Sequence, residues 1–238
     1  MPPFLSPLPR VRLVDSFARP FDGVVAAART CYSPKGIVTV DDVAGDALAD
    51  PAERARRREK RDALARDVYA AGHHTTFQHA HLQFTLENVS RQLVWSFLHA
   101  HPHYNSEQTS QRYVEVKPGR YAVPALAGEA LEVYRACCEM QTEAYRRLGE
   151  LLVPVAARAF YATFRGRATQ PGRWEAAVRK RALEVARYVL PVATFTTLYH
   201  TVSAVTLFRY RRLAASFDAP SEQRLVVEAM TEELLRHD

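Results

Sequence analysis

Histidine is the residue type in this sequence that most clearly suggests chemistry, because seven of its nine histidines lie within residues 73–103. The stretch HAHPHYNSEQTSQRY, residues 99–113, places His99, His101 and His103 at alternate positions. Alternate side chains of an extended segment share one face, so these imidazoles could together bind a zinc ion. Hydrogen-bonded histidines in a polar loop are an equally simple interpretation of the same stretch.

Neither the acidic residues nor the cysteines complete a familiar metal or nucleophile motif. Glu87 and Glu107 lie at no known metal spacing, and the sequence contains no HExxH or CxxC motif. Cys31, Cys137 and Cys138 lie in no recognisable nucleophile motif. Because these motifs are missing, we expect no metal site. Three cysteines give no disulfide framework, so we expect a reducing, cytoplasmic location.

The net charge of +6 points to anionic partners without selecting one class of them. The densest basic run, RARRREKR at residues 54–61, is typical of a solvated helix face. No stripe of mixed aromatic and basic residues accompanies it, so the sequence predicts no nucleic-acid binding. Small anionic substrates such as nucleotides suit this charge equally well.

The elements that position these residues alternate between helix and strand in the first half of the chain. Asp50 followed by Pro51 predicts a helix start, and Gly72 predicts the end of that helix. HLQFTLEN alternates apolar and polar residues, which predicts a strand. In chain order we expect a strand at residues 11–13, helices at 21–32 and 51–72, a strand at 81–88, a helix at 90–100 and a strand at 112–116.

The second half is predicted to be almost entirely helical. Apolar residues recur at helical spacing between Leu131 and Leu152, which places Cys138 in the core. The helices expected after that are residues 174–190, residues 193–215 and a last one that begins at Ser221.

One apolar run, residues 188–205, could be mistaken for a membrane span. Pro191, several threonines and His200 interrupt it, so we expect a buried helix and no membrane segment. The chain is then a single domain, residues 1–238, of the α+β class, with a small antiparallel sheet packed against many helices.

The order of four segments resembles that of the flavin-dependent thymidylate synthases, the ThyX family. ARTCYSPKG is similar to the family's AARxSY segment, and GHHTTFQH is similar to its GHETPFEH-like stretch. HAHPHYNSEQTSQRY stands where the family has an RHR signature and an S-x-R-Y ending. VARYVLP is similar to the family's ARxVLP segment, and the resemblance covers most of the chain.

The resemblance implies a ThyX-like fold and a methylation of uridylate, UMP or dUMP, at C5. It also implies FAD as cofactor, methylenetetrahydrofolate as one-carbon donor and NADPH as reductant. The reduced flavin supplies the hydride in this route, which is consistent with the missing nucleophilic cysteine. Family members form homotetramers whose active sites are built from several chains. The sequence departs from the family pattern at several positions, which indicates a specialised relative. The UMP/dUMP methylases of nucleoside-antibiotic biosynthesis are the type that it resembles most.

The resemblance also assigns residues to the site. The residues that match substrate-binding positions are Gln108, Ser110, Gln111, Arg112 and Arg187. The residues that match or stand near flavin-binding positions are Cys31, His73, Thr75, Gln78, His99, His101, Glu107, Ser203 and Arg209.

The chain departs from the family pattern where cations are expected. Every alignment of the RHR tripeptide loses both arginines and keeps a histidine, and the family's V-N-x-R segment has become VSAV. The family's catalytic arginine falls at Ala214, so we expect Arg212 to replace it, with Arg209 on the same helical face and Arg211 about 100° away. A non-catalytic subunit that binds nucleotide and completes a partner's active site fits these losses too.

Overall fold

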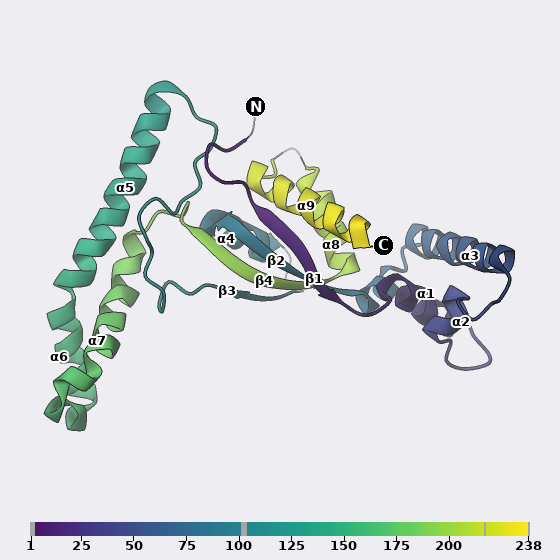
Figure 1. Ribbon diagram of the computed structural model, residues 1–238, viewed down its shortest axis with the longest axis horizontal. Coiled ribbons are helices and arrows are strands. Elements are labelled where there is room, and N and C mark those ends of the chain that lie inside the picture. The colour runs from purple at the N-terminus through teal and green to yellow at the C-terminus, as the bar shows by residue number, and fades with distance from the viewer. Residues whose placement is uncertain (1–2, 101–103, 217, 238) are drawn as a thin grey trace. The chain divides into compact units, whose positions relative to one another are not determined.

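The computed structural model describes residues 3–100, 104–216 and 218–237 (Figure 1). The chain divides into two compact units. Unit 1 comprises Met1–Pro9, Glu87–Trp95 and Gln108–Leu198. Unit 2 comprises Arg10–Leu86, Ser96–Glu107 and Tyr199–Asp238. That residues 1–238 act as a single domain stays a prediction.

One four-stranded antiparallel sheet, with strand order β1-β2-β4-β3, accompanies the helices. Along β2 the apolar side chains of Leu82, Phe84 and Leu86 are almost fully buried, as their alternation with polar residues predicted. The predicted α+β class with a small antiparallel sheet is therefore confirmed. The strands are β1 (Arg10–Ser16), β2 (His81–Ser90), β3 (Tyr104–Gln108) and β4 (Phe195–Ser203).

The predicted helix at residues 193–215 was wrong over its first half. Phe195–Ser203 forms strand β4, and only Ala204–Ala214 is helical, as α8. Burial along β4 alternates strictly, with Thr196 and His200 among its buried residues. The physical reason is the period-2 pattern of threonine, valine and aromatic residues, which pack well on a pleated surface. The apolar run at 188–205 is accordingly not a buried helix.

The predicted strand at residues 112–116 was also wrong, because this segment begins in a turn. The backbone N–H groups of Tyr113 and Val114 both donate to the carbonyl of Ser110, at 3.1 and 3.0 Å. The strand instead precedes the turn, as β3, and the Thr109 N–H donates to the Thr197 carbonyl at 3.0 Å.

Four helices of unit 2, α1, α3, η1 and α8, pack around one apolar cluster. α3 begins as predicted, since the Asp50 side chain accepts a hydrogen bond from the Ala52 N–H at 2.9 Å. Val24 of α1, Val68 of α3 and Phe77 of η1 pack together in the core. The helices are α1 (Pro20–Thr30), α2 (Val40–Ala44), α3 (Pro51–Ala70), the 3-10 helix η1 (His74–His79), α8 and α9 (Ser221–His237).

Unit 1 is built on long helices, and α5 runs beside α7 (Figure 1). The two helices approach closely at Gly149, where an added Cβ would lie 2.9 Å from Leu183 Cδ2. Cys138 is buried with Tyr121, and burial raises the pKa of its thiol, which fits the predicted core role. The helices are α5 (Gly128–Leu151), α6 (Val153–Thr163), α7 (Pro171–Ala186), and the 3-10 helices η2 (Arg165–Thr169) and η3 (Arg187–Val189).

Helix α4 (Arg91–Ala100) follows β2 without an intervening loop. In the described part of the chain, no helix combines the length and apolar character that a membrane span requires.

A buried polar chain links three elements of unit 2. His200 on β4 is fully buried, its Nδ1 lies 2.5 Å from the Ser106 hydroxyl of β3, and its Nε2 lies 3.1 Å from the Tyr210 hydroxyl of α8. Phe97 and Tyr104 pack their rings against the imidazole. Burial lowers the pKa of His200 to about 4, so the ring is neutral in the folded protein at neutral pH.

The neutral state of His200 makes folding stability depend on pH. The unfolded chain binds a proton at this residue below its ordinary pKa of 6.5, whereas the folded chain resists until about 4. The contribution of His200 to stability is therefore fully present above pH 6.5, and about 3 kcal/mol is lost as the pH drops toward 4. Urea unfolding at pH 7.5 and 5.0 should show a smaller pH dependence in His200→Gln than in the wild type. The exposed His237 offers a control, and an unchanged pH dependence in His200→Gln would contradict the assignment.

Candidate functional site

Arg91 occupies a central position among the polar residues of unit 1. As the first residue of α4, it donates from Nη1 to Gln108 Oε1 at 2.7 Å and from Nη2 to the Thr109 carbonyl. Its backbone N–H donates to the Thr194 carbonyl at 3.0 Å. Its Nε is buried and has no hydrogen-bond partner within the described residues. The guanidinium is thus fixed by two hydrogen bonds, and its Nε is left without an acceptor among the described residues.

Arg187 adds a second positive charge within interaction range of Arg91. Burial, and then the charge of Arg187, lower the pKa of the Arg91 guanidinium. Arg187 begins η3, and its Nε donates to the Glu184 carbonyl at 3.1 Å. Because like charges repel, a bound anion would stabilise the arrangement.

Arg112 provides a third guanidinium, from the turn that follows β3. Its Nη2 lies 2.6 Å from Glu184 Oε1, and its backbone N–H donates to the Ser110 hydroxyl at 3.2 Å. Glu184 therefore contacts Arg112 through its carboxylate and Arg187 through its carbonyl. The same carboxylate pairs with Arg181 at 3.0 Å, so one acid serves several cations.

The five substrate residues that the sequence predicted all belong to unit 1. Gln108 is exposed at the end of β3, and Gln111 is half-buried in the same turn as Ser110 and Arg112. Arginine forks and a serine hydroxyl are the groups that bind phosphate with paired, charge-assisted hydrogen bonds. The arrangement can therefore hold a phosphate monoester.

Sequence reasoning missed Arg91 and Glu184 as members of this site. Arg91 had one signal, its place in the SRQ sequence directly after the alternating strand β2. Glu184 had none, because its contact with Arg112 joins segments that are distant along the chain.

Four predicted flavin residues lie on or directly beside two neighbouring elements of unit 2, α1 and η1. His73 is half-buried, its Nδ1 is buried without a hydrogen-bond partner in the described residues, and its ring meets Tyr32 edge-on. Thr75 and Gln78 are exposed on η1, and Cys31 is exposed at the C-terminal end of α1. An unsatisfied imidazole beside free polar side chains fits a cofactor that accepts or donates hydrogen bonds here.

The other predicted flavin residues that the structure describes are dispersed over four elements. Ser203 ends β4 directly before α8, and its hydroxyl lies 3.1 Å from the Thr206 hydroxyl. Glu107, Arg209 and His99 are exposed, on β3, on α8 and near the end of α4 respectively. His101 lies outside the described residues, as does His103. Among the residues that are described, no group of three or more histidines, cysteines and acids could hold a metal ion.

Arg212 lines a cavity of about 900 Å³ in unit 2, together with Arg211. Phe77 and Phe208 meet edge-on in its wall, with ring centroids 5.5 Å apart. Arg209, which we expected beside Arg212, is not among the described lining residues. Aromatic walls with guanidinium groups suit a flat ring that carries or develops negative charge.

Comparison with known proteins identifies the family. The family model described as thymidylate synthase complementing protein matches residues 12–237. A flavin-dependent thymidylate synthase of Clostridium tetani is 26% identical over 228 residues, which cover 94% of this chain and 82% of the relative. The Nitratidesulfovibrio vulgaris enzyme of the same name is 29% identical over 225 residues, or 93% of this chain and 80% of the relative.

Two solved structures share the fold. The UMP/dUMP methylase PolB of Streptomyces cacaoi, bound with 5-Br dUMP, has a TM-score of 0.59 at 23% identity, covering 96% of this chain and 90% of that one. The Helicobacter pylori flavin-dependent thymidylate synthase ThyX, complexed with FAD and dUMP, has a TM-score of 0.58 at 15% identity, covering 94% and 93%. Since the family model spans nearly the whole sequence, this chain belongs to the thymidylate synthase complementing protein family, that of the flavin-dependent thymidylate synthases, as a divergent member.

Proposed function

We propose that this chain methylates C5 of a uridine nucleotide, UMP or dUMP, with FAD as cofactor, methylenetetrahydrofolate as one-carbon donor and NADPH as reductant. Membership of the family makes it an enzyme of the flavin-dependent thymidylate synthase kind. The observation that carries the substrate class is a linked set of three arginines: Arg112 and Arg187 both contact Glu184, and Arg187 lies within electrostatic range of Arg91. The similar proteins PolB and ThyX, bound with 5-Br dUMP and with dUMP, support the same class.

Phosphate binding is the step for which this chain is best equipped. The unpartnered Nε of Arg91 and the guanidinium of Arg187 offer donors in a half-buried setting, where charge-assisted hydrogen bonds are strong. A phosphate would also relieve the repulsion between these two cations. Arg112 would share its charge between Glu184 and the phosphate.

The flavin would be held by residues around α1 and η1 and at the junction of β4 with α8. His73, Thr75 and Gln78 offer unsatisfied or free polar groups, and Cys31, Ser203 and Arg209 are further candidates. His99 near the end of α4, Glu107 on β3 and His101, from the stretch that replaces the RHR signature, would complete the set. When bound, reduced flavin supplies the hydride for the methyl group, and the protein supplies position and electrostatics.

Arg212 is the proposed catalytic group. Attack from C5 of uracil requires negative charge to develop on the ring, and a fixed cation lowers the barrier by stabilising that charge. The aromatic wall of its cavity supports this role, because it keeps water away from one side of a flat ligand.

A homotetramer with active sites shared between chains, and a cytoplasmic location, complete the proposal and rest on the family resemblance alone. The alternative is a nucleotide-binding subunit without its own activity, which would bind UMP and show no methylation of it.

Removal of one phosphate ligand should weaken binding of the nucleotide and not of the nucleoside. Arg187→Ala and Arg112→Ala should each cost about 1.5–3 kcal/mol of UMP affinity, the range for hydrogen bonds to charged groups. Titration calorimetry with UMP and with uridine provides the comparison. Arg181→Ala, which removes a cation that also pairs with Glu184, should leave UMP affinity unchanged. Equal losses for UMP and uridine would show that these arginines do not bind phosphate.

Replacement of the proposed catalytic cation should slow chemistry and spare binding. Arg212→Ala should lower the rate of UMP methylation about 10²–10³-fold, the cost of losing a preorganised charge-stabilising donor. FAD content and UMP affinity should stay at their wild-type values. Arg211→Ala, in the same cavity, is the matched comparison. A full rate in Arg212→Ala together with a slow Arg211→Ala would assign the role to Arg211 instead.

A further inference from the structure

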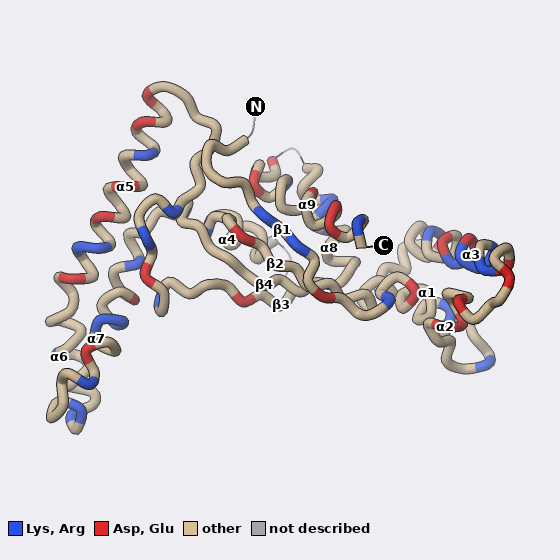
Figure 2. Tube along the Cα trace, in the orientation of Figure 1, with Lys and Arg blue, Asp and Glu red and all other residues tan. Residues whose placement is uncertain are grey.

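Another cavity, of about 690 Å³, lies in unit 2 where α3 packs against α1 and α2. We call it the α3 cavity. Its apolar lining comes from Val25, Val43, Leu48 and Leu64. Its charged lining consists of Arg29, Arg56, Arg57, Lys60 and Arg61, with Glu53 as the one acid among the described lining residues. Figure 2 shows the density of basic residues along α3.

Two of these cations are held side by side. Arg29 and Arg57 both donate from Nη1 to the Asp42 carbonyl, at 3.3 and 2.9 Å. The stem of Arg57 passes over Gly45, where an added Cβ would lie 2.8 Å from Arg57 Cγ. The Asp42 carboxylate accepts bonds from the backbone and hydroxyl of Thr39, and it offsets only part of their charge. A like-charged pair fixed in this way favours a bound anion.

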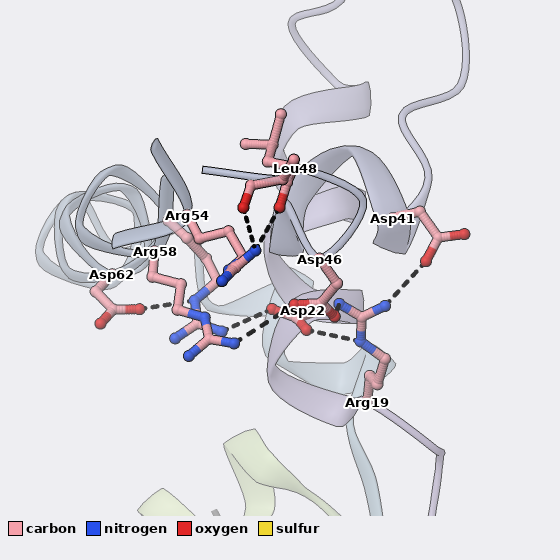
Figure 3. A network of polar contacts seen from close by, with 10 residues as sticks. Arg19, Asp22, Asp41, Asp46, Leu48, Arg54, Arg58 and Asp62 are labelled. Atoms are coloured by element: carbon pink, nitrogen blue, oxygen red, sulfur yellow. Dashed lines mark hydrogen bonds and ion pairs between the residues drawn. The ribbon is translucent and has the colours of Figure 1, made fainter. Parts of the chain in front are cut away.

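Two more cations of the cavity have no partner. Arg56 and Lys60 are exposed and make no ion pair or hydrogen bond within the described residues. Their basic neighbours on α3 do have partners, which Figure 3 shows for part of this network. Arg58 pairs with Asp46 at 3.4 Å, and Arg54 donates to the Leu48 carbonyl at 2.6 Å. Arg61 pairs with Asp22 at 2.9 Å, which leaves the excess charge with the other four cations.

We propose that the α3 cavity binds a small molecule that carries clustered phosphate or carboxylate oxygens on an apolar body. Guanidinium and ammonium groups supply the donors for such oxygens, and the buried Val25 and Val43 supply an apolar floor. Among the described lining residues none is aromatic, so the stacking surfaces that single-stranded nucleic acid requires are missing.

Both co-substrates of the proposed reaction have this chemistry. NADPH carries a 2′-phosphate and a pyrophosphate, and a folate ends in one or more glutamates. The link to these molecules rests on the proposed function, whereas the anion site itself does not.

The test is equilibrium binding to the full chain, first with inorganic pyrophosphate alone. The double variant Arg56→Gln/Lys60→Gln should weaken pyrophosphate binding about tenfold or more, because it removes two charged hydrogen-bond donors. Arg58→Gln, on the same helix but outside the cavity, should bind like the wild type. Both residues of the double variant are exposed and make no ion pair or hydrogen bond within the described residues. UMP affinity is measured alongside, and an unchanged value will show that unit 1 is intact. A failure of the anion site is then distinguished from a failure of the proposed function.

Two further titrations identify the source of the anion. If the double variant loses affinity for NADPH and keeps its affinity for NADH, the site binds the 2′-phosphate. If it loses affinity for polyglutamylated folate and keeps its affinity for monoglutamylated folate, the site binds the glutamate chain. Pyrophosphate binding that is equal in the double variant and in Arg58→Gln would overturn the site. So would a chain that binds oligonucleotides through these residues and none of the small anions.

Discussion

The half-buried guanidinium of Arg91 is the constraint around which the candidate substrate site is organised. It ties the start of α4 to the end of β3 through Gln108 and Thr109, and its backbone ties the same point to Thr194. Partial burial of a cation without a carboxylate partner has a cost, which other dipoles or an anion can offset. The protein supplies two oxygens and leaves Nε without an acceptor among the described residues, which supports the proposed phosphate site at this position.

In unit 2, too, carboxylates neutralise only some of the arginines. Where the fold requires rigidity, arginines are matched by acids, as Arg19 is by Asp22, Asp41 and Asp46 (Figure 3). In two cavities, the one with Arg212 and the α3 cavity, guanidinium groups outnumber carboxylates among the described lining residues. At these two concave places the field of the excess positive charge is strong, so a small anion would be stabilised there.

Local patterns in the sequence predicted what local physics determines. The Asp50–Pro51 cap predicted the start of α3, and the alternation in HLQFTLEN predicted β2. The helix expected in place of β4 was wrong because the threonines and His200 were interpreted as interruptions of an apolar helix, whereas they follow the period of two that is typical of a strand. Motif resemblance predicted Arg112 and Arg187 as substrate ligands, but the roles of Arg91 and Glu184 arise from contacts between distant segments that no local pattern contains.

The loss of the RHR arginines makes flavin binding the central claim, because imidazole groups are largely uncharged at neutral pH and bind a pyrophosphate less strongly than guanidinium. The most direct measurement is the visible absorption spectrum of the purified chain, followed by titration with FAD. We predict a flavin spectrum with less than one FAD per chain, which added FAD raises to full occupancy. A colourless protein that binds no FAD even at high concentration would contradict the account and favour a nucleotide-binding subunit that serves a partner's active site.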